Sequence, residues 1–335
     1  MRNERIPDRN IAMELVRTTE AAALAAARWM GRGDKNAADG AAVDAMRMML
    51  DTVDMDGIVV IGEGEKDEAP MLLNGEHVGN GRGPQVDVAV DPLEGTRLLA
   101  NGSPNAVSVV GVAPRGTMYN PHDIFYMEKL AVGPAARGEI DLSAPIAWNI
   151  QRVVKAKDIS LEELTVVILD RDRNTTIADE VRAAGSRIKF ITDGDVAGAV
   201  MSAVSGTGVD MLLGIGGSPE GVLAACALKA LGGDIHCRLW PRHDADRRVA
   251  AERGLDLTEV LTIDDLVRSD DVFFAASGVT GGEMLQGVEY VPGGATSESL
   301  VMRSRSGTIR KIQTEHHWRK LQTISGDRYR GEREE

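Results

Sequence analysis

The chain has 335 residues, of which 43% are hydrophobic and 27% are charged, and its formal net charge is −13. This length exceeds the usual size of one hydrophobic core, so we expect two domains or one large layered unit. The negative charge argues against a nucleic-acid partner. Because no apolar run could cross a bilayer and the start of the chain lacks a secretory signal, we expect a cytoplasmic protein without membrane contacts.

The first part of the chain predicts two helices. Residues 10–34 combine apolar residues at helical spacing with good helix formers, and glycines end the pattern. Residues 37–53 predict a second amphipathic helix, with Met46 and Leu50 on its inner face. Asp39 falls near the start of this second helix.

Short runs rich in Val and Ile come next. Each run is stopped by Gly, Pro or an acid, and together they predict strands at 57–65, 85–91 and 105–114. A helical pattern over 144–156 follows them.

Strand and helix patterns then alternate regularly. The predicted elements are strand 164–170, helix 176–185, strand 187–192, helix 196–204, strand 209–216, helix 219–232 and strand 234–240. This order predicts an α/β fold with a largely parallel sheet covered on both faces. Three more strands are predicted at 270–278, 299–307 and 308–314. The change of pattern near residue 160 predicts two α/β domains, over 1–160 and 161–335.

The cysteines and histidines show no pattern typical of metal or redox sites. Cys226 and Cys237 lack the spacing of zinc ligands, so we expect two reduced, buried thiols. The six histidines share no ligand spacing, and we expect the adjacent His316 and His317 to be exposed.

Several acidic residues stand where predicted strands or helices begin or end. They are Asp39, Glu63, Asp91 and Glu94. In α/β sheets, strand ends converge on a crevice that usually binds ligands, so these carboxylates can meet there. Each one alone is more commonly a solvated or capping group, whereas the set indicates a site for divalent cations.

The segment "VDPLEGT" concentrates several features of a phosphate site. We expect Pro92 to end the strand and to leave Asp91 pointing toward the crevice. Gly95 permits close approach of the backbone to a ligand, and the Thr96 hydroxyl could orient a water. A simple turn with a helix cap would explain Asp91 and Thr96, but it leaves Glu94 without a role. We therefore predict a site for metal ions and a phosphate ester.

Phosphate monoesters need help to react because they hydrolyse extremely slowly in water. Paired hard cations held by carboxylates neutralise the charge of the ester and lower the pKa of a bound water. Such a site requires no covalent nucleophile.

Two later strand ends carry further candidate residues. Asp193 and Asp195 suit sugar hydroxyls or a metal, although acids in a first helical turn are an equally good explanation. In "GIGGSPEG", Gly217 and the preceding glycine could cradle an oxyanion, and Glu220 opens a helix. Pro219 breaks the dinucleotide-binding fingerprint, which argues against a nucleotide-dependent dehydrogenase.

The segment "LDRDRN" places two guanidinium groups at a strand end. Arg171 and Arg173 could grip a second phosphate. Surface ion pairs with Asp170 and Asp172 are the alternative explanation.

Seven motifs occur in an order that resembles one family. They are "GRGDKNAADGAAVDAMR", "IGEGEKDEAPML", "VDPLEGT", "YMEKL", "DGDVA", "GIGGSPEG" and "IRKIQT". The chain resembles the class II fructose-1,6-bisphosphatases, which are related to the lithium-sensitive phosphatases, from about residue 10 to residue 317. The resemblance implies a layered αβαβα sandwich of the sugar phosphatase type, a hydrolase that uses Mn²⁺ or Mg²⁺, a place in gluconeogenesis, and a homodimer or homotetramer.

The resemblance also implies roles for individual residues. One metal would be held by Asp39 and Glu63, and the other by Asp91, Glu94 and Glu220. Gly95 and Thr96 would meet the scissile phosphate, with Thr96 also aligning the water, and Lys35 and Asp67 would tune the metal and the nucleophile. The sugar and its distal phosphate would be bound by Tyr126, Arg171, Arg173, Asp193, Asp195 and Gly217. We expect lysine at the position of Arg171, so the geometry there departs from the family pattern.

The expected reaction is hydrolysis of the 1-phosphate of fructose 1,6-bisphosphate, without a phosphoenzyme. A related phosphatase acting on sedoheptulose 1,7-bisphosphate or an inositol phosphate is the nearest alternative. A regulator that binds metal or sugar phosphate without turnover is the alternative from another class, and it would need a broken set of metal ligands.

Overall fold

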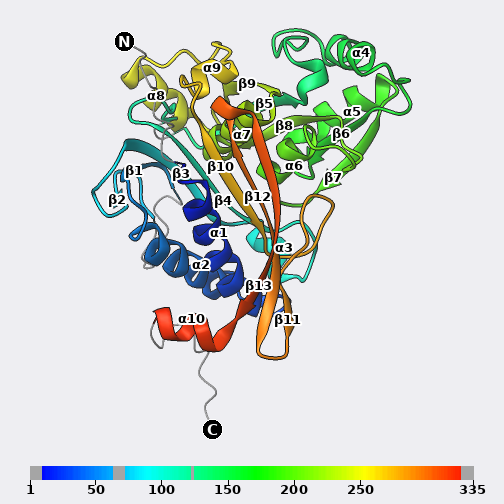
Figure 1. Cartoon of the computed structure of the whole chain (residues 1–335). Coiled ribbons are helices and arrows are strands. Elements are labelled where there is room, and N and C mark those ends of the chain that lie inside the picture. Colours follow the sequence, from blue (N-terminus) through cyan, green and yellow to red (C-terminus); the bar gives the residue numbers. More distant parts are fainter. Residues whose placement is uncertain (1–9, 63–71, 122–123, 326–335) are drawn as a thin grey trace, which may run out of the picture.

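The structure is a computed structural model that describes residues 10–62, 72–121 and 124–325. Figure 1 shows a mixed α/β protein with two sheets, which confirms the predicted fold class. Within the described residues, no helix is both long enough and apolar enough to span a membrane.

The larger sheet has eight strands in the order β11-β12-β10-β4-β3-β1-β2, with β13 paired to β12. Its strands are β1 (Asp56–Ile61), β2 (His77–Val78), β3 (Gln85–Glu94), β4 (Val107–Pro114), β10 (Phe273–Gly278), β11 (Glu289–Val291), β12 (Gly294–Arg303) and β13 (Thr308–His317). Strands β1 and β3 are parallel, and every other pair in this sheet is antiparallel. The sheet is therefore mixed.

The smaller sheet has five strands in the order β7-β6-β8-β5-β9. They are β5 (Tyr126–Val132), β6 (Thr165–Leu169), β7 (Arg187–Ile191), β8 (Met211–Gly217) and β9 (Asp234–Leu239). The parallel pairing of β6 with β7 and β8 agrees with the predicted alternation of strand and helix. Strand β5 was not predicted, and it runs antiparallel between β8 and β9, so this sheet is also mixed. The prediction of a largely parallel sheet is therefore wrong for both sheets.

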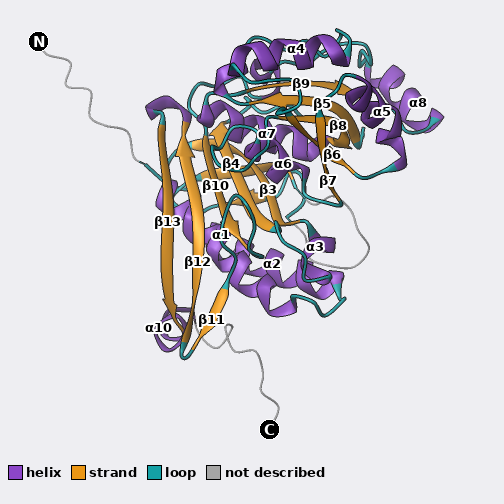
Figure 2. Ribbon diagram, turned by 90° about the vertical axis from the view of Figure 1, so that its right-hand side faces the viewer, coloured by secondary structure: helices purple, strands orange, loops and turns teal. Residues whose placement is uncertain are grey.

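The helices and sheets form five layers (Figure 2). Helices α1 (Ala12–Ala26) and α2 (Lys35–Leu50) cover one face of the larger sheet. Helices α6 (Asp195–Met201) and α7 (Ser218–Leu231) lie between the two sheets. Helices α4 (Ile146–Lys157) and α5 (Thr175–Ala183) cover the outer face of the smaller sheet. The predicted αβαβα sandwich is confirmed.

The sequence of each strand and helix matches its layer. In β6, Val167 faces the layer between the sheets whereas Val166 and Ile168 face the outer helices, because side chains alternate along a strand. Helix α7 is apolar on nearly all sides because both sheets pack on it. Its run "GVLAACALKAL" is consequently buried almost throughout.

Shorter elements connect these layers. They are α3 (Thr96–Ala100), α8 (Asp244–Arg253), α9 (Ile263–Leu266), α10 (Trp318–Ser325), and the 3₁₀ turns Ala27–Trp29, Pro134–Ala136, Asp172–Asn174 and Ser304–Ser306.

The chain passes between the two sheets more often than the predicted division at residue 160 suggests. Strand β5 precedes that residue and belongs to the smaller sheet, whereas β10 to β13 return to the larger one. Sheet membership therefore does not follow the predicted boundary, and the division into two domains stays a prediction.

Strands β12 and β13 form a long hairpin at one edge of the larger sheet (Figure 1). The prediction that both adjacent histidines are exposed is wrong for one of them. His317 is exposed, but His316 is buried, and its Nε2 lies 2.8 Å from Ser297 Oγ. The alternation of side chains along β13 places the two rings on opposite faces.

Candidate active site

Strand β3 carries two candidate carboxylates at its C-terminal end. Asp91 and Ala89 share one face of the strand, and Ala89 packs in the layer between the sheets. The expectation that Pro92 ends the strand is wrong: the pairing is irregular between Asp91 and Glu94, and β3 continues to Glu94. A β-bulge tolerates a proline because the ladder is already interrupted there. The backbone N–H of Leu93 donates to Asp91 Oδ1 at 3.0 Å and fixes the turn.

Gly95 joins β3 to α3. Its φ of +88° is in the left-handed region, which favours glycine, and a Cβ there would lie 2.9 Å from Leu98 Cδ1. Thr96 is the first residue of α3, which has five residues. Strand, bulge and turn thus present Asp91, Glu94 and Thr96 within one short segment.

Glu94 links β3 to α6 across the layer between the sheets. It is only 5% exposed, and its Oε1 accepts a hydrogen bond from the backbone N–H of Val196 at 2.8 Å. Asp195, the residue before Val196, is also buried. Two acids that are far apart in the sequence therefore meet in one place. The predicted convergence of Asp39, Glu63, Asp91 and Glu94 on one pocket stays a prediction.

The carboxylates at this place influence one another. Burial raises the pKa of Glu94, and the negative charges of Asp195 and Glu220 raise it further, although a hydrogen bond with Asp91 acts in the opposite direction. Burial also raises the pKa of Glu220, and the negative charge of Asp195 raises it further. Glu94, Asp195 and Glu220 therefore form an acidic cluster whose charges repel one another, in which Glu94 and Asp195 are buried and Glu220 is half-buried.

Lys129 lies against this acidic cluster, and the sequence analysis gave it no role. It is 2% exposed, and its Nζ lies 2.6 Å from Asp195 Oδ2. A lysine inside the apolar strand "YMEKLAV" is unusual, because a buried ammonium needs a partner. The lysine within this apolar segment could have indicated from the sequence that an acidic partner lies nearby.

Gly216 and Gly217, at the end of β8, lie beside the acidic cluster. A Cβ on Gly216 would lie 1.9 Å from Asp195 Oδ2, and one on Gly217 would lie 1.9 Å from Glu220 Oε2. The glycines of "GIGGSPEG" therefore make room for these carboxylates. Their predicted role, to cradle an oxyanion of the ligand, stays a prediction.

Arg173 and Tyr126 form a second group beside this site. The guanidinium carbon of Arg173 lies 4.5 Å from the centre of the Tyr126 ring, and its Nε donates to the backbone oxygen of Ile215 at 3.0 Å. Tyr126 pairs with Gly217 in the register of β5 and β8. This group therefore lies at the end of β8, next to the first turn of α7, which contains Glu220.

Asp193 connects the end of β7 to α3. Its Oδ2 accepts a hydrogen bond from the backbone N–H of Arg97 at 3.2 Å, and its Oδ1 lies 4.0 Å from an Arg171 nitrogen. Arg171 also donates to the backbone oxygens of Asp170 and Thr192. The two predicted binding residues are thus neighbours beside Thr96.

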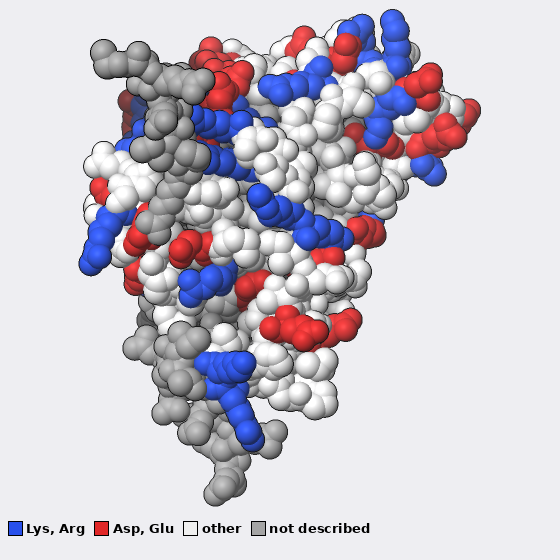
Figure 3. Space-filling view, viewed as in Figure 1, with Lys and Arg blue, Asp and Glu red and all other residues white. Residues whose placement is uncertain are grey.

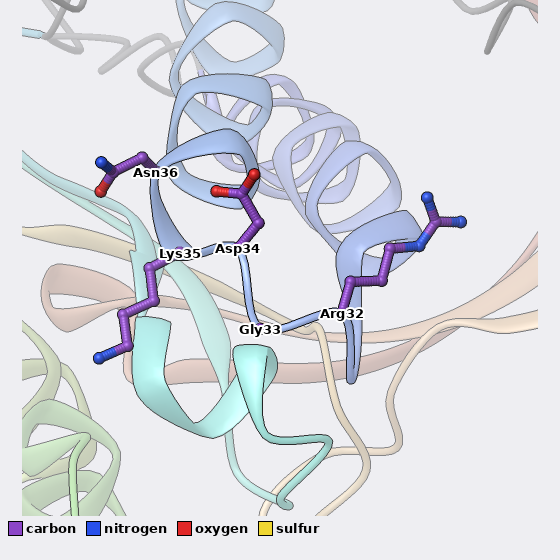
Figure 4. Close-up of a pocket in the computed structure, with 5 residues that line it drawn as sticks. All are labelled: Arg32, Gly33, Asp34, Lys35 and Asn36. Atoms are coloured by element: carbon purple, nitrogen blue, oxygen red, sulfur yellow. The ribbon is translucent and has the colours of Figure 1, made fainter.

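Helix α2 contributes Lys35 and Asp39, and it packs against α3. Lys35 is the first residue of α2, so Asp39 lies in the second turn of this helix rather than at its start. A surface depression of about 490 Å³ is lined by residues 32–36. In Figure 4 the Lys35 side chain extends from this depression beside α3.

Two predicted residues, Glu63 and Asp67, lie outside the described residues. Across residues 10–62, 72–121 and 124–325, no three His, Cys, Asp or Glu side chains are arranged so that they could hold a metal ion. The chemistry of the acidic cluster nevertheless fits a hard cation, because carboxylate oxygens are its preferred ligands. Glu220 Oε2 is buried and has no hydrogen-bond partner among the described residues, so it could accept a cation.

Comparisons with known proteins give consistent matches over nearly the whole chain. The family model described as bacterial fructose-1,6-bisphosphatase, glpX-encoded, matches residues 9–316. Fructose-1,6-bisphosphatase 1 class 2 of Escherichia coli (strain K12) is 48% identical over 322 residues, which cover 92% of this chain and 96% of that protein. The class 2 enzyme of Shigella flexneri matches with the same identity and coverage. The crystal structure of extragenic suppressor protein suhB from Bartonella henselae aligns with 58% of this chain and 73% of its own, at 15% identity and a TM-score of 0.33.

Proposed function

The chain belongs to the bacterial, glpX-encoded fructose-1,6-bisphosphatases, and on that premise we propose how its residues share the work of hydrolysis. A member of this family is a metal-dependent hydrolase of gluconeogenesis whose substrate is a sugar bisphosphate. We propose that this chain releases the 1-phosphate of fructose 1,6-bisphosphate and leaves fructose 6-phosphate.

One observation carries the proposal. Glu94, Asp195 and Glu220 come from three separate segments and meet as one acidic cluster near Thr96. A protein with a net charge of −13 can bind a bisphosphate at such a cluster only if cations lie between them.

We propose Mn²⁺ or Mg²⁺ as those cations. Asp39 and Glu63 would hold one ion. Asp91, Glu94 and Glu220 would hold the other, and because their carboxylates are not arranged as a metal site in the structure, they would have to close around it. When bound, such ions neutralise the charge of the ester and lower the pKa of a water.

The chain's own groups would bind and orient the reacting phosphate. Gly95 allows the backbone to approach the phosphate closely, and the Thr96 hydroxyl would hold the attacking water in line with phosphorus. Lys35 and Asp67 would lie at the border of this site, where Lys35 would attract the anionic ester and Asp67 would accept a proton from the water.

The sugar and the distal phosphate would bind on the side of the smaller sheet. Arg171 and Arg173 would grip the distal phosphate, because guanidinium groups match its oxygens. Tyr126, Asp193 and Gly217 would contact the sugar. Asp195 is buried, so it would support this surface rather than contact the sugar directly.

A phosphate-release assay over a panel of substrates tests the proposal. The panel contains fructose 1,6-bisphosphate, sedoheptulose 1,7-bisphosphate, fructose 1-phosphate and inositol 1-phosphate, each with Mn²⁺ or Mg²⁺. We expect the highest kcat/KM for fructose 1,6-bisphosphate. Equal rates on the monophosphates would contradict the proposal that the site binds two phosphates. A higher kcat/KM for sedoheptulose 1,7-bisphosphate would mean that this seven-carbon sugar is the substrate instead.

Assembly and location are further parts of the proposal. We propose a homodimer or homotetramer in the cytoplasm, where sugar bisphosphates are available. Light scattering coupled to size-exclusion chromatography measures the mass of the assembly. A mass equal to the 35.9 kDa of one chain would contradict it.

A further inference from the structure

Lys129 is a buried cation in contact with the acidic cluster. Its strand neighbours Met127 and Ala131 belong to the core between the sheets, so the alternation of β5 directs Lys129 into that same layer. Burial lowers the pKa of the Lys129 ammonium, but the charges of Asp195 and Glu220 raise it, and the net shift is upward. The side chain is therefore charged.

The chain leaves space for the pair that Lys129 forms with Asp195. A Cβ on Gly216 would lie 1.9 Å from Asp195 Oδ2 and 3.1 Å from Lys129 Nζ. A Cβ on Gly221 would lie 3.6 Å from Lys129 Cε, which is an ordinary contact. Residue 216 must therefore be small for this ion pair to exist in its present place.

Asp195 lies close to the proposed metal site but is not one of its proposed ligands. Its charge acts on both Glu94 and Glu220, so it lies close to two of the proposed ligands. An unpaired carboxylate there would compete for the cation or repel Glu94. The 2.6 Å contact with Lys129 instead directs Asp195 Oδ2 toward β5.

The same contact fixes a hydrogen bond to Glu94. Asp195 is the first residue of α6, and the next residue, Val196, donates its backbone N–H to Glu94 Oε1 at 2.8 Å. Holding Asp195 in place therefore also holds the group that orients Glu94.

We propose that Lys129 is a positioning residue, which neutralises Asp195 and holds it away from the metals so that Glu94 and Glu220 remain available as ligands. This inference rests on the proposed function. Lys129 touches neither substrate nor metal, and it acts through Asp195.

Three variants should change the affinity for Mn²⁺ in different directions, and these directions distinguish a positioning role from a merely structural one. Lys129→Met removes one positive charge beside the metal site, so it should bind Mn²⁺ at least about tenfold more tightly and lower kcat. Asp195→Asn leaves the ammonium unpaired and should bind Mn²⁺ at least about tenfold more weakly. The double variant has the same net charge as the wild type, so its dissociation constant should lie within about threefold of the wild-type value.

Isothermal titration calorimetry of the metal-free full chain with Mn²⁺ alone measures these constants, and circular dichroism checks the fold. Lys229→Met is the matched control, because Lys229 is also buried and pairs with an acid, Asp264, at 2.7 Å. It lies nine residues after Glu220 on α7, about 14 Å along the helix. This control should leave the Mn²⁺ dissociation constant unchanged.

Weaker binding in all three variants, or a Lys129→Met variant that matches the control, would overturn the role of Lys129. Removing one partner of a buried pair is costly, so Lys129→Met could fail to fold. The double variant must then bind Mn²⁺ at least about threefold more tightly than Asp195→Asn, and any smaller difference overturns the inference. A wild type that neither binds Mn²⁺ nor releases phosphate would overturn the proposed function as well.

Discussion

The negative charge of Glu94 destabilises the metal-free protein but is needed for activity in the metal-loaded protein, and one substitution separates these two effects. Its folded-state pKa is raised by burial and by neighbouring acids, above an unfolded value of about 4.3. The protonated Glu94 side chain therefore contributes fully to stability below the unfolded-state pKa of about 4.3, and this contribution is lost as the pH rises through the raised folded-state pKa. As the pH rises, ionisation of Glu94 adds to the repulsion among the acids of the metal-free protein, whereas metal-loaded protein uses the same charge.

We therefore expect Glu94→Gln to raise the melting temperature of metal-free protein at pH 8. The same change should lower kcat/KM by about 10²–10³-fold, because a carboxylate that would hold the cation at the reacting phosphate is gone. Thermal unfolding in a chelator and phosphate release with Mn²⁺ measure the two effects.

Glu298→Gln is the control for this prediction. Glu298 is equally buried, but it lies in β12, near Lys311 at 3.1 Å, and accepts from the backbone N–H of Gln286 at 2.7 Å. This variant should lose stability and keep its activity. A Glu94→Gln variant that behaves in the same way would contradict the placement of Glu94 in the site.

The residues that the sequence could locate are those within one segment. Asp91, Glu94, Gly95 and Thr96 follow one another, so the change from strand to turn predicted their common position. The pair of Lys129 with Asp195 could not be predicted, because their 66-residue separation closes only when β5 inserts beside β8. The contact depends on the order of the strands, which local pattern does not determine.

Among the elements, the hairpin of β12 and β13 contains a group that responds to pH. His316 is buried, and burial lowers its pKa below the usual value of about 6.5. The folded state therefore favours the neutral ring. Its contribution to stability is present above about pH 6.5 and is lost as the pH falls through the lowered pKa.

We expect wild-type stability to fall as the pH decreases below about 6.5, by at most about 1.4 kcal/mol per pH unit for one proton. His316→Gln should remove this part of the slope, whereas His317→Gln, which changes an exposed ring, should retain it. Urea unfolding at pH 5, 6, 7 and 8 measures the slopes. Glu20 accepts from Thr314 of the same hairpin, and burial raises its pKa, so the difference between variants is the relevant quantity.

Equal slopes in the wild type and in His316→Gln would show that the pKa of His316 is the same in the folded and unfolded states, which would contradict the prediction. A loss of slope in His317→Gln would assign the effect to the exposed ring instead.

The elements differ in how well the sequence predicted them. The alternation from residue 164 to residue 240 predicted β6 to β9 and the helices between them, because each element has its own period. Strand β5 was missed although its residues are strongly apolar, because Glu128 and Lys129 interrupt the pattern. Their partners, Arg238 and Asp195, lie on distant segments that no local pattern reveals.

At the scale of the whole molecule, three clusters of buried apolar residues fill the spaces between the five layers. The central cluster contains residues of both sheets together with α6 and α7, so each sheet depends on the same helices. On the face shown in Figure 3, Lys and Arg side chains are interspersed with Asp and Glu. The negative net charge therefore does not make this face uniformly acidic.

The two thiols lie on opposite sides of α7 and can report whether the layers separate together. Cys226 is on α7 and faces the larger sheet, where a Cβ on Gly111 would lie 3.0 Å from its Sγ. Cys237 is on β9 and faces α7, where a Cβ on Gly221 would lie 3.5 Å from its Sγ. Both are buried, and burial raises the pKa of each thiol to about 12.

We expect neither thiol to react with Ellman's reagent in the native protein at pH 8, and both to react in guanidinium chloride, because the reagent needs an exposed thiolate. Cys226→Ala and Cys237→Ala leave one thiol each, so the slow native-state reaction of each can be followed alone. Since one continuous core holds both thiols, opening should expose them at the same rate, within about threefold. A much faster reaction of Cys237 would mean that the smaller sheet separates from α7 by itself, and that two independently opening units better describe the chain.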